Sequence, residues 1–537
     1  MGKSELCIYS IISGILLSLA WFEWFSGIIL LVAFLPILFV EDHIDENKQQ
    51  YRSVKAFNYS FLTFFTWNVL TTWWICNATF VGFIFAVLIN CLLMSSVFWI
   101  FHITKRKLGA KLGYFGFIVY WLAYEHFCLN AEISWPWLNL GNGFANDIIL
   151  IQWYEYTGAL GGTLWVLMVN VILFYIIKNY IKIRNLKNIK VETSIILLLI
   201  ISPVIFSLIR FNTYKEKGNP YNIVVLQPNI DPYEKFVGVS NEIQTLILLH
   251  LADSLTDRAT DYIVAPETAI NNNIWEENIN GNSCIYPIKV FLNKYPKAKF
   301  IVGITSYKRY TNEKDITPTA RKIPGTDLYY DSFNTAIQLD STDSIQLYRK
   351  SKLVVGVEKM PLPQYLGFLR KLTLRLGGTF RSHGTQDYRS TFYSPHDSVR
   401  IAPVICYESV FGEFVTEYIK NGANFIFIIT NDGWWGDTPG YKQHHNYSRL
   451  RATETRRSIA RSANTGISSL INQKGEIINS TTWWKRTGIK GQININDKLS
   501  FYTKHGDFIG RIADLLALLL LLYTIAYCLM NKKIHLK

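Results

Sequence analysis

The chain has 537 residues, more than one domain usually contains, and hydrophobic residues make up 50% of it. This composition is too apolar for an ordinary soluble enzyme, so we expect part of the chain to lie in a membrane. The net charge of +14 does not indicate a nucleic-acid partner, because no nucleic-acid-binding motif accompanies it and many of the cations lie between apolar runs.

Apolar runs of bilayer-spanning length occur along most of the N-terminal half and again near the C-terminus. We count eight of them, at 5–22, 24–40, 57–75, 79–103, 113–129, 160–178, 192–210 and 511–530, each of roughly 17 to 25 residues. The second run follows the first closely with no small-residue cleavage site between them, so the first is expected to be a helix, not a signal peptide. The sequence thus predicts a seven-helix bundle over residues 1–212 and an eighth helix with a short tail over 508–537.

Lysine and arginine residues alternate between successive connections of these runs. They follow the second, fourth, sixth and last runs, whereas the connections after the first, third and fifth runs contain none. By the positive-inside rule, both termini are then cytoplasmic and the polar segment 213–507 lies on the opposite side. The expected location is a bacterial inner membrane, spanned several times, with this segment in the periplasm.

The polar segment 213–507 alternates strand-like and helix-like stretches. Helix-like stretches include 240–255 and 445–463. The strand-like runs are rich in apolar and β-branched residues and lie at 222–227, 261–267, 299–305, 333–339, 400–408, 424–432 and 467–473. This pattern predicts a layered α/β domain with buried central strands.

Three of these stretches each present one reactive side chain at or just after a strand-like run, namely Glu267, Lys350 and Cys406. A carboxylate can accept a thiol proton, the thiolate can attack a carbonyl carbon, and an ammonium can stabilise the resulting oxyanion. Strand ends are also where layered α/β domains place their sites. The leading hypothesis is a catalytic thiol. Taken singly, the cysteine could instead be a packing residue, or pair with Cys284 in a disulfide.

Six motifs in the polar segment resemble those of carbon-nitrogen hydrolases, the nitrilase superfamily. They are QPNI (227–230), PET (266–268), YRKSKLVVGVEKMP (348–361), ICYES (405–409), TNDGWWGDTPGYKQH (430–444) and RATETRRSIARSANTGISSLI (451–471). With the apolar runs, the whole chain resembles the membrane branch of that superfamily, the apolipoprotein N-acyltransferases. The resemblance implies an αββα sandwich for the polar domain.

The resemblance also implies an activity. Members of this family transfer an acyl chain from a phospholipid to the N-terminal amine of diacylglyceryl-modified apolipoproteins, by a ping-pong mechanism through a thioester. The expected partners are therefore the phospholipid donor, these apolipoproteins and membrane lipids. No metal and no organic cofactor are expected, and the protein is expected to be a monomer.

Carried over residue by residue, the resemblance assigns roles to the three reactive side chains. Glu267 would be the general base, Lys350 the oxyanion-stabilising cation and Cys406 the nucleophile. Supporting or substrate-binding roles are implied for Glu358, Tyr407, Glu408, Phe236, Trp434 and Trp435. Phe236 stands where the family often has Trp, and the tryptophan pair is expected either over the site or in the core.

Two other function classes compete with this interpretation. A membrane-tethered amidase or nitrile hydrolase would use the same thiol with water as the acceptor, but one anchor would suffice for it. A transporter or receptor would need ionisable residues inside the apolar runs, and these are few. An acyltransferase is therefore the preferred prediction.

Overall fold

A computed structural model describes residues 1–183, 190–235, 238–359, 382–394 and 397–534 of the chain. The chain divides into two compact units. The first, the helical unit, contains residues 1–76, 80–213 and 505–537. The second, the catalytic unit, contains residues 77–79 and 214–504.

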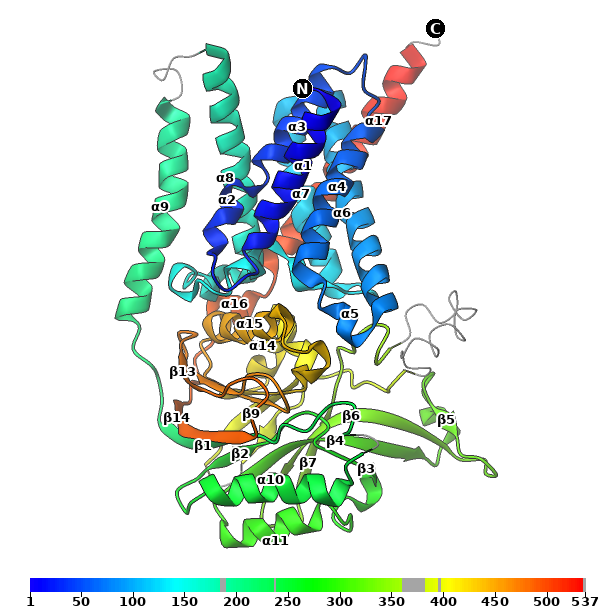
Figure 1. Cartoon of the computed structure of the whole chain (residues 1–537), viewed down its shortest axis with the longest axis vertical. Helices are drawn as coiled ribbons and strands as arrows, with labels where there is room; N and C mark the ends of the chain where they lie inside the picture. Colours follow the sequence, from blue (N-terminus) through cyan, green and yellow to red (C-terminus); the bar gives the residue numbers. More distant parts are fainter. Residues whose placement is uncertain (184–189, 236–237, 360–381, 395–396, 535–537) are drawn as a thin grey trace. The chain divides into compact units, whose positions relative to one another are not determined.

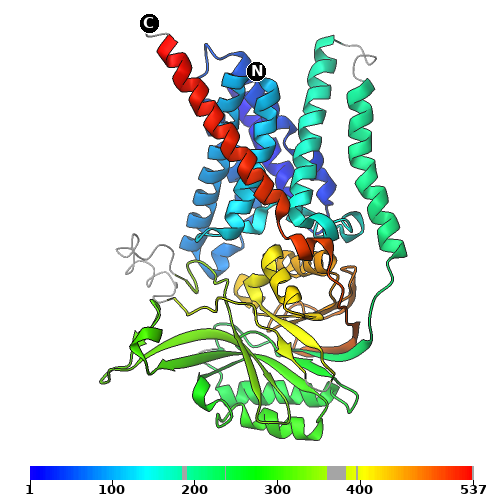
Figure 2. The ribbon, with the colours of Figure 1, turned by 180° about the vertical axis from the view of Figure 1, so that it is seen from behind.

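Each apolar run found in the sequence is largely helical in the structure, although the second is divided into a 3-10 turn (Gly27–Ile29) and two α-helices. The helices of this part are α1 (Lys3–Leu19), α2 (Leu30–Ala33), α3 (Leu35–Glu46), α4 (Val54–Thr72), α5 (Ile75–Ala78), α6 (Phe80–Leu108), α7 (Ala110–Asn130), α8 (Tyr154–Ile183), α9 (Lys190–Thr213) and α17 (Phe508–Ile534). Among the described residues, five helical stretches are long and apolar enough to cross a membrane: Gly27–Glu46, Phe80–Leu108, Tyr154–Lys182, Lys190–Thr213 and Phe508–Asn531. The C-terminal helix α17 packs against α6 and α7 (Figure 2).

Ionisable residues at one end of the helical unit are buried and paired. The Lys105 ammonium on α6 lies 2.6 Å from Glu41 Oε2 and 3.0 Å from Asp42 Oδ1 on α3, and His102 Nδ1 lies 2.7 Å from Glu41 Oε1. These opposite charges tie α3 to α6. The contacts favour a structural role for the cluster over a conducting pathway.

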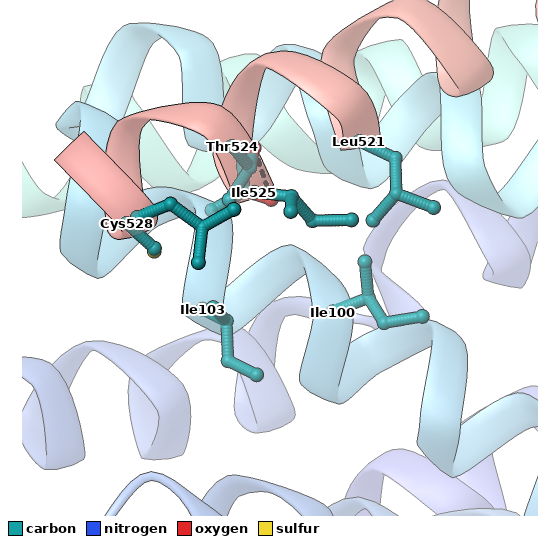
Figure 3. A pocket seen from close by; sticks show the side chains of 8 residues that line it. Ile100, Ile103, Leu521, Thr524, Ile525 and Cys528 are labelled. Carbon is teal, nitrogen blue, oxygen red and sulfur yellow. Dashed lines mark hydrogen bonds between the residues drawn. The ribbon is translucent and has the colours of Figure 1, made fainter.

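An apolar cavity of about 250 Å³ lies between α6 and α17 (Figure 3). Its lining includes Ile100 and Ile103 of the first helix and Leu521 and Ile525 of the second. The cavity contains none of the three reactive side chains predicted from the sequence.

Two sheets form the centre of the catalytic unit. In the described part of the chain, the first sheet contains β1 (Pro220–Gln227), β2 (Tyr262–Val264), β3 (Ile270–Trp275), β4 (Lys299–Tyr310), β5 (Arg321–Lys322), β6 (Tyr329–Leu339), β7 (Ile345–Arg349) and β14 (Thr487–Asn494). The second contains β8 (Phe392–Tyr393), β9 (Arg400–Ile405), β10 (Phe425–Thr430), β11 (Ile459–Ala463), β12 (Ser469–Ile471) and β13 (Ile477–Ser480). The central strands β1–β2–β4 and β9–β10–β11 run parallel within each sheet.

Helices cover the outer faces of the two sheets. On the first sheet lie α10 (Asn241–Leu255) and α11 (Tyr286–Lys294) (Figure 1). They bury Leu248, Ile288 and Leu292 in one cluster with strand residues such as Ile263 and Phe300. On the second sheet lie α14 (Gly412–Lys420) and α15 (Pro439–Thr455). The inner faces meet through aromatic pairs such as Tyr262 with Phe427. The predicted αββα sandwich is confirmed.

One predicted element is wrong in part. The helix expected over 445–463 ends at Thr455, and β11 begins at Ile459. Arg456 has φ 53°, a left-handed conformation that ends the helix. Residues 459–463 then pair with β10 as a central strand.

Candidate active site

Lys350 connects two carboxylates in the interior of the catalytic unit. Lys350 follows β7, and its Nζ lies 2.9 Å from Glu267 Oε1 and 2.9 Å from Glu358 Oε1. Burial alone would lower the pKa of Lys350, but Glu267 and Glu358 raise it, and the pKa lies well above its ordinary value. Lys350 therefore keeps its positive charge throughout the neutral pH range.

Glu267 projects from a turn that packs tightly against β4. The Gly303 N–H on β4 donates to Pro266 O at 3.1 Å, and a Cβ on Gly303 would lie 2.6 Å from Glu267 Cα. Glycine is thus required at position 303 for the turn to approach the strand. Thr268, the next residue, has φ 44°, which is unusual for a side chain branched at Cβ.

A buried lysine that the sequence did not single out supports this turn. Lys235 Nζ donates to Glu267 O at 3.0 Å and to Thr268 Oγ1 at 3.1 Å. Burial lowers the pKa of Lys235 to about 8, and the nearby Glu267 carboxylate opposes that decrease. Lys235 thus fixes the main chain of Glu267, whereas Lys350 contacts its side chain.

Cys406 begins a short 3-10 helix (Cys406–Val410) directly after β9. Its φ of 50° is left-handed, a strained conformation for a residue with a Cβ, and such strain is often found at functional sites. Burial is the main reason that the pKa of the Cys406 thiol lies well above its ordinary value. Glu267 raises this pKa further, whereas Lys350 lowers it. The resting thiol is therefore protonated, and forming the thiolate requires a base.

The buried Glu408 joins the end of β7 to the nucleophile segment. Its Oε1 accepts hydrogen bonds from Tyr348 OH at 2.7 Å and Ser351 N at 2.7 Å, and its Oε2 accepts one from Ile405 N at 2.9 Å. Burial raises the pKa of Glu408, and these hydrogen bonds oppose the increase. Ser351 follows Lys350 and Ile405 precedes Cys406. Glu408 therefore links the main chain next to one reactive residue to the main chain next to the other.

A second buried ionic network, formed by Asp432, Arg461 and His444, contacts the Cys406 segment. Asp432 Oδ2 is 2.7 Å from Arg461 Nη2, Asp432 Oδ1 is 2.9 Å from His444 Nδ1, and all three side chains are essentially inaccessible to solvent. His444 Nε2 lies 3.3 Å from Cys406 O and 3.1 Å from Ser409 Oγ. This network thus contacts the main chain of the nucleophile through His444.

The remaining predicted site residues are aromatic, and most of them pack against other rings of the catalytic unit. Tyr407 is buried with its ring against Phe411. Trp435 packs edge-on against His444, so it contacts the second ionic network, while Trp434 packs against Tyr233. Phe236 lies outside the described residues.

The predicted disulfide alternative is wrong. Cys284 and Cys406 are both free thiols, and Cys284 is buried in the core beside the first sheet. Within the described ranges, no group of three or more His, Cys, Asp or Glu side chains is placed to hold a metal ion.

Sequence reasoning overlooked Asn334, which lies within β6 in a run that looks like an ordinary strand. Its Nδ2 donates to Glu267 Oε1 at 2.7 Å and to Glu358 Oε1 at 2.9 Å. The one available signal was a polar amide in a largely apolar stretch, and Gln338 of the same strand gives the same signal. The contact of His444 with Cys406 O was missed as well, because no local pattern in the sequence relates these two residues.

Comparison with known proteins identifies the family. Residues 13–172 match the apolipoprotein N-acyltransferase N-terminal domain, and residues 302–498 match the carbon-nitrogen hydrolase domain. The chain is 27% identical to the apolipoprotein N-acyltransferase of Chlorobaculum tepidum over 517 residues, 94% of this chain and 93% of that protein. The chain belongs to the apolipoprotein N-acyltransferase family, within the nitrilase superfamily.

Other relatives extend this comparison. The apolipoprotein N-acyltransferase of Geobacter metallireducens is 25% identical, covering 93% of this chain and 91% of that one. Among solved structures, Saccharomyces cerevisiae Nit3 is 13% identical with a TM-score of 0.37, covering 52% of this chain and 92% of that chain. A Nesterenkonia amidase of the nitrilase superfamily is 10% identical with a TM-score of 0.37, covering 55% and 97%.

Proposed function

We propose that the protein transfers an acyl chain from a phospholipid to the N-terminal α-amine of diacylglyceryl-modified apolipoproteins, through a thioester on Cys406. The observation that carries this proposal is the buried Lys350, held between Glu267 and Glu358, beside a thiol at the carboxyl end of β9. The family of the chain supplies the substrate class. The protein is a membrane enzyme.

The first half-reaction forms the thioester. Glu267 takes the proton of Cys406, and the sulfur attacks the ester carbonyl carbon of the phospholipid. The carbonyl oxygen becomes an oxyanion, which the Lys350 ammonium and the main-chain N–H of Tyr407 stabilise. When the tetrahedral intermediate collapses, the C–O bond breaks and the lysophospholipid oxygen receives the proton from Glu267.

The second half-reaction transfers the acyl group to the amine. The neutral α-amine of the apolipoprotein attacks the thioester carbon, and Glu267 accepts the proton that the nitrogen loses. The C–S bond breaks, the amide is released, and the Cys406 thiolate regains its proton from Glu267. Glu267, Cys406 and the two substrates account for every bond and proton that changes in the two half-reactions.

Glu267 is prepared for both proton transfers by the way its two oxygens are used. Its Oε1 accepts hydrogen bonds from Lys350 and Asn334. Among the described residues, its Oε2 accepts none. We assign the proton transfers to Oε2, because the other oxygen is already occupied by two donors.

Labelled phospholipid distinguishes this function from hydrolysis. Without an acceptor, the enzyme is expected to accumulate a hydroxylamine-labile acyl group on Cys406, because a thioester shielded from water has no rapid exit. An S-diacylglyceryl cysteine peptide with a free amine should discharge that group into an amide, whereas its N-acetylated form should not. The Cys406→Ala variant is the control and should carry no label.

A different product would point to a tethered hydrolase. If the label appeared promptly as free fatty acid, and the free-amine peptide neither accelerated its loss nor became labelled, then water would be the acceptor and the proposed function would be wrong.

The alternation of lysine and arginine between connections supports an orientation with both termini in the cytoplasm and the catalytic unit in the periplasm. A reporter that is active only outside the cytoplasm should therefore work when fused after residue 300 and fail after residues 107 and 535. Activity at residue 107 together with none at residue 300 would reverse this topology.

A further inference from the structure

Two donors and two acceptors form a closed ring around the catalytic carboxylates. Lys350 Nζ and Asn334 Nδ2 each donate to Glu267 Oε1 and to Glu358 Oε1, over distances of 2.7 to 2.9 Å. Lys350 is the charged donor of the family's chemistry, whereas Asn334 is a neutral amide on a different strand. Both carboxylates thus accept a hydrogen bond from a residue to which no part of the proposed mechanism assigns a role.

Asn334 is held in place by its main chain and is buried. Its main-chain oxygen accepts the Lys350 N–H at 2.8 Å, so the backbone that carries the cation also fixes the amide. The side chain is buried, with an exposed fraction of 5%. A buried amide that donates both of its N–H bonds to carboxylates stabilises their anionic forms, because hydrogen bonds to charged groups are the stronger class.

We propose that Asn334 is a positioning residue that keeps Glu267 and Glu358 ionised together and turns the open oxygen Oε2 of Glu267 toward the reaction. Two carboxylates that share one site ordinarily repel each other, so that one of them holds a proton near neutral pH. Lys350 offsets that repulsion with its charge, and Asn334 adds two directional donors. This inference rests on the proposed function for the identity of the base.

Several other titratable groups interact with these two carboxylates and contribute to their pH dependence. Lys235 and Cys406 interact with Glu267, and Lys350 and His383 interact with Glu358. Burial raises the pKa of Glu358, but Lys350 and the Val354 N–H lower it, with a net decrease. Removing the Asn334 amide takes one donor from each carboxylate, so the pair should take up a proton more readily while Lys350 remains charged.

The test is the pH dependence of two reactions in the full-length protein. The first is acyl transfer. The second is alkylation of Cys406 by iodoacetamide, followed on the Cys406 peptide by mass spectrometry, which requires no lipid. In Asn334→Ala, both rates should be reduced more at pH 5 than at pH 9, because the acid limb moves upward. A shift of one pH unit would give a loss of up to about tenfold below both pKa values and little loss well above them.

Gln338→Ala is the matched control, since Gln338 is a buried amide on the same strand that donates to Tyr393 O at 3.2 Å instead of to a carboxylate. Its profile should run parallel to the wild-type profile. The ratio of rates at the two pH values does not depend on the amount of folded protein, so partial misfolding of a variant cannot imitate the expected result.

An Asn334→Ala profile parallel to wild type, at any amplitude, would overturn the inference. If phospholipid fails to label wild-type Cys406, the proposed function fails, while the alkylation profiles still decide the role of Asn334. Asn334→Ser, which retains one donor, should give an acid limb between those of the wild type and Asn334→Ala. If its acid limb coincided with that of Asn334→Ala, this would also contradict the inference.

Discussion

Replacing Cys406 with alanine is expected to abolish acyl transfer, and Glu267→Gln and Lys350→Ala should each remove nearly all of it. Each change deletes a different part of one step: the nucleophile, the base or the oxyanion-stabilising charge. Residues that act together in one step are strongly non-additive, so the triple variant should be hardly worse than Cys406→Ala alone. The measurement is transfer from labelled phospholipid to a lipopeptide, normalised to folded protein in the membrane.

Cys284→Ala is the matched control for the thiol. Cys284 is likewise a free cysteine of the catalytic unit, but it is buried in the core beside the first sheet. This variant should keep most of the activity. Substantial turnover by Cys406→Ala, or an inactive but well-folded Cys284→Ala, would remove the case for Cys406 as the nucleophile.

Lys350→Ala has a second expected consequence. Without the ammonium, Glu267 and Glu358 would face each other with only Asn334 between them, and one of them should take up a proton. The remaining activity should therefore depend on pH more steeply than that of Cys284→Ala.

The sequence was sufficient to place the three reactive residues because each lies next to a strand end. Glu267 follows β2 and Cys406 follows β9, both inner parallel strands, and Lys350 follows β7. The alternation of apolar runs predicts those strand ends, which is where layered α/β domains place their sites. Because β2 and β7 belong to the first sheet and β9 to the second, the packing of the two sheets brings Cys406 to the other two residues. The roles assigned to them remain predictions.

The supporting contacts could not be found in this way, because they join residues that are distant in sequence. Asn334 reaches Glu267 across 67 residues and Lys235 reaches it across 32. No local periodicity reports which face of β6 points toward the site. Gln338, on the same strand, has a similar local pattern, but it donates to the main-chain oxygen of Tyr393.

The partial failure at 445–463 has a similar cause. Arg456 and Arg457 look like the exposed face of a continuing helix, but their side chains are buried, with exposed fractions of 3% and 1%. Arg457 is satisfied by distant main-chain carbonyls, donating to Ala423 O at 2.9 Å and Lys498 O at 2.8 Å. A sequence pattern assigns arginine to solvent, since buried arginine is rare unless such acceptors are present.

Asp432→Asn is expected to destabilise the catalytic unit strongly. The variant leaves the fully buried Arg461 without its carboxylate, and removing one partner of a buried ion pair costs about 3 to 5 kcal/mol. For a domain of this size the apparent midpoint of thermal unfolding, followed by tryptophan fluorescence in detergent, should fall by on the order of 10 °C. Transfer activity should fall as well, because asparagine leaves one acceptor oxygen for both Arg461 and His444, and His444 contacts Cys406 O.

The exposed Asp437, on the same loop, supplies the control, and Asp437→Asn should change the free energy of unfolding by less than about 0.5 kcal/mol. If both variants behaved alike, the ionic network around Asp432 would not be a stabilising one.

The difference between wild type and Asp432→Asn should also depend on pH. Burial alone would raise the pKa of Asp432, but Arg461 and His444 lower it far below its ordinary value. A carboxylate with a lowered pKa in the folded state contributes stability that is fully present above its unfolded pKa of about 3.9 and is lost as the pH falls below it. The difference in unfolding midpoint between wild type and Asp432→Asn should thus be constant between pH 5 and pH 8 and should shrink below pH 4. A difference that grew on acidification would show that Asp432 is not the anion that pairs with Arg461.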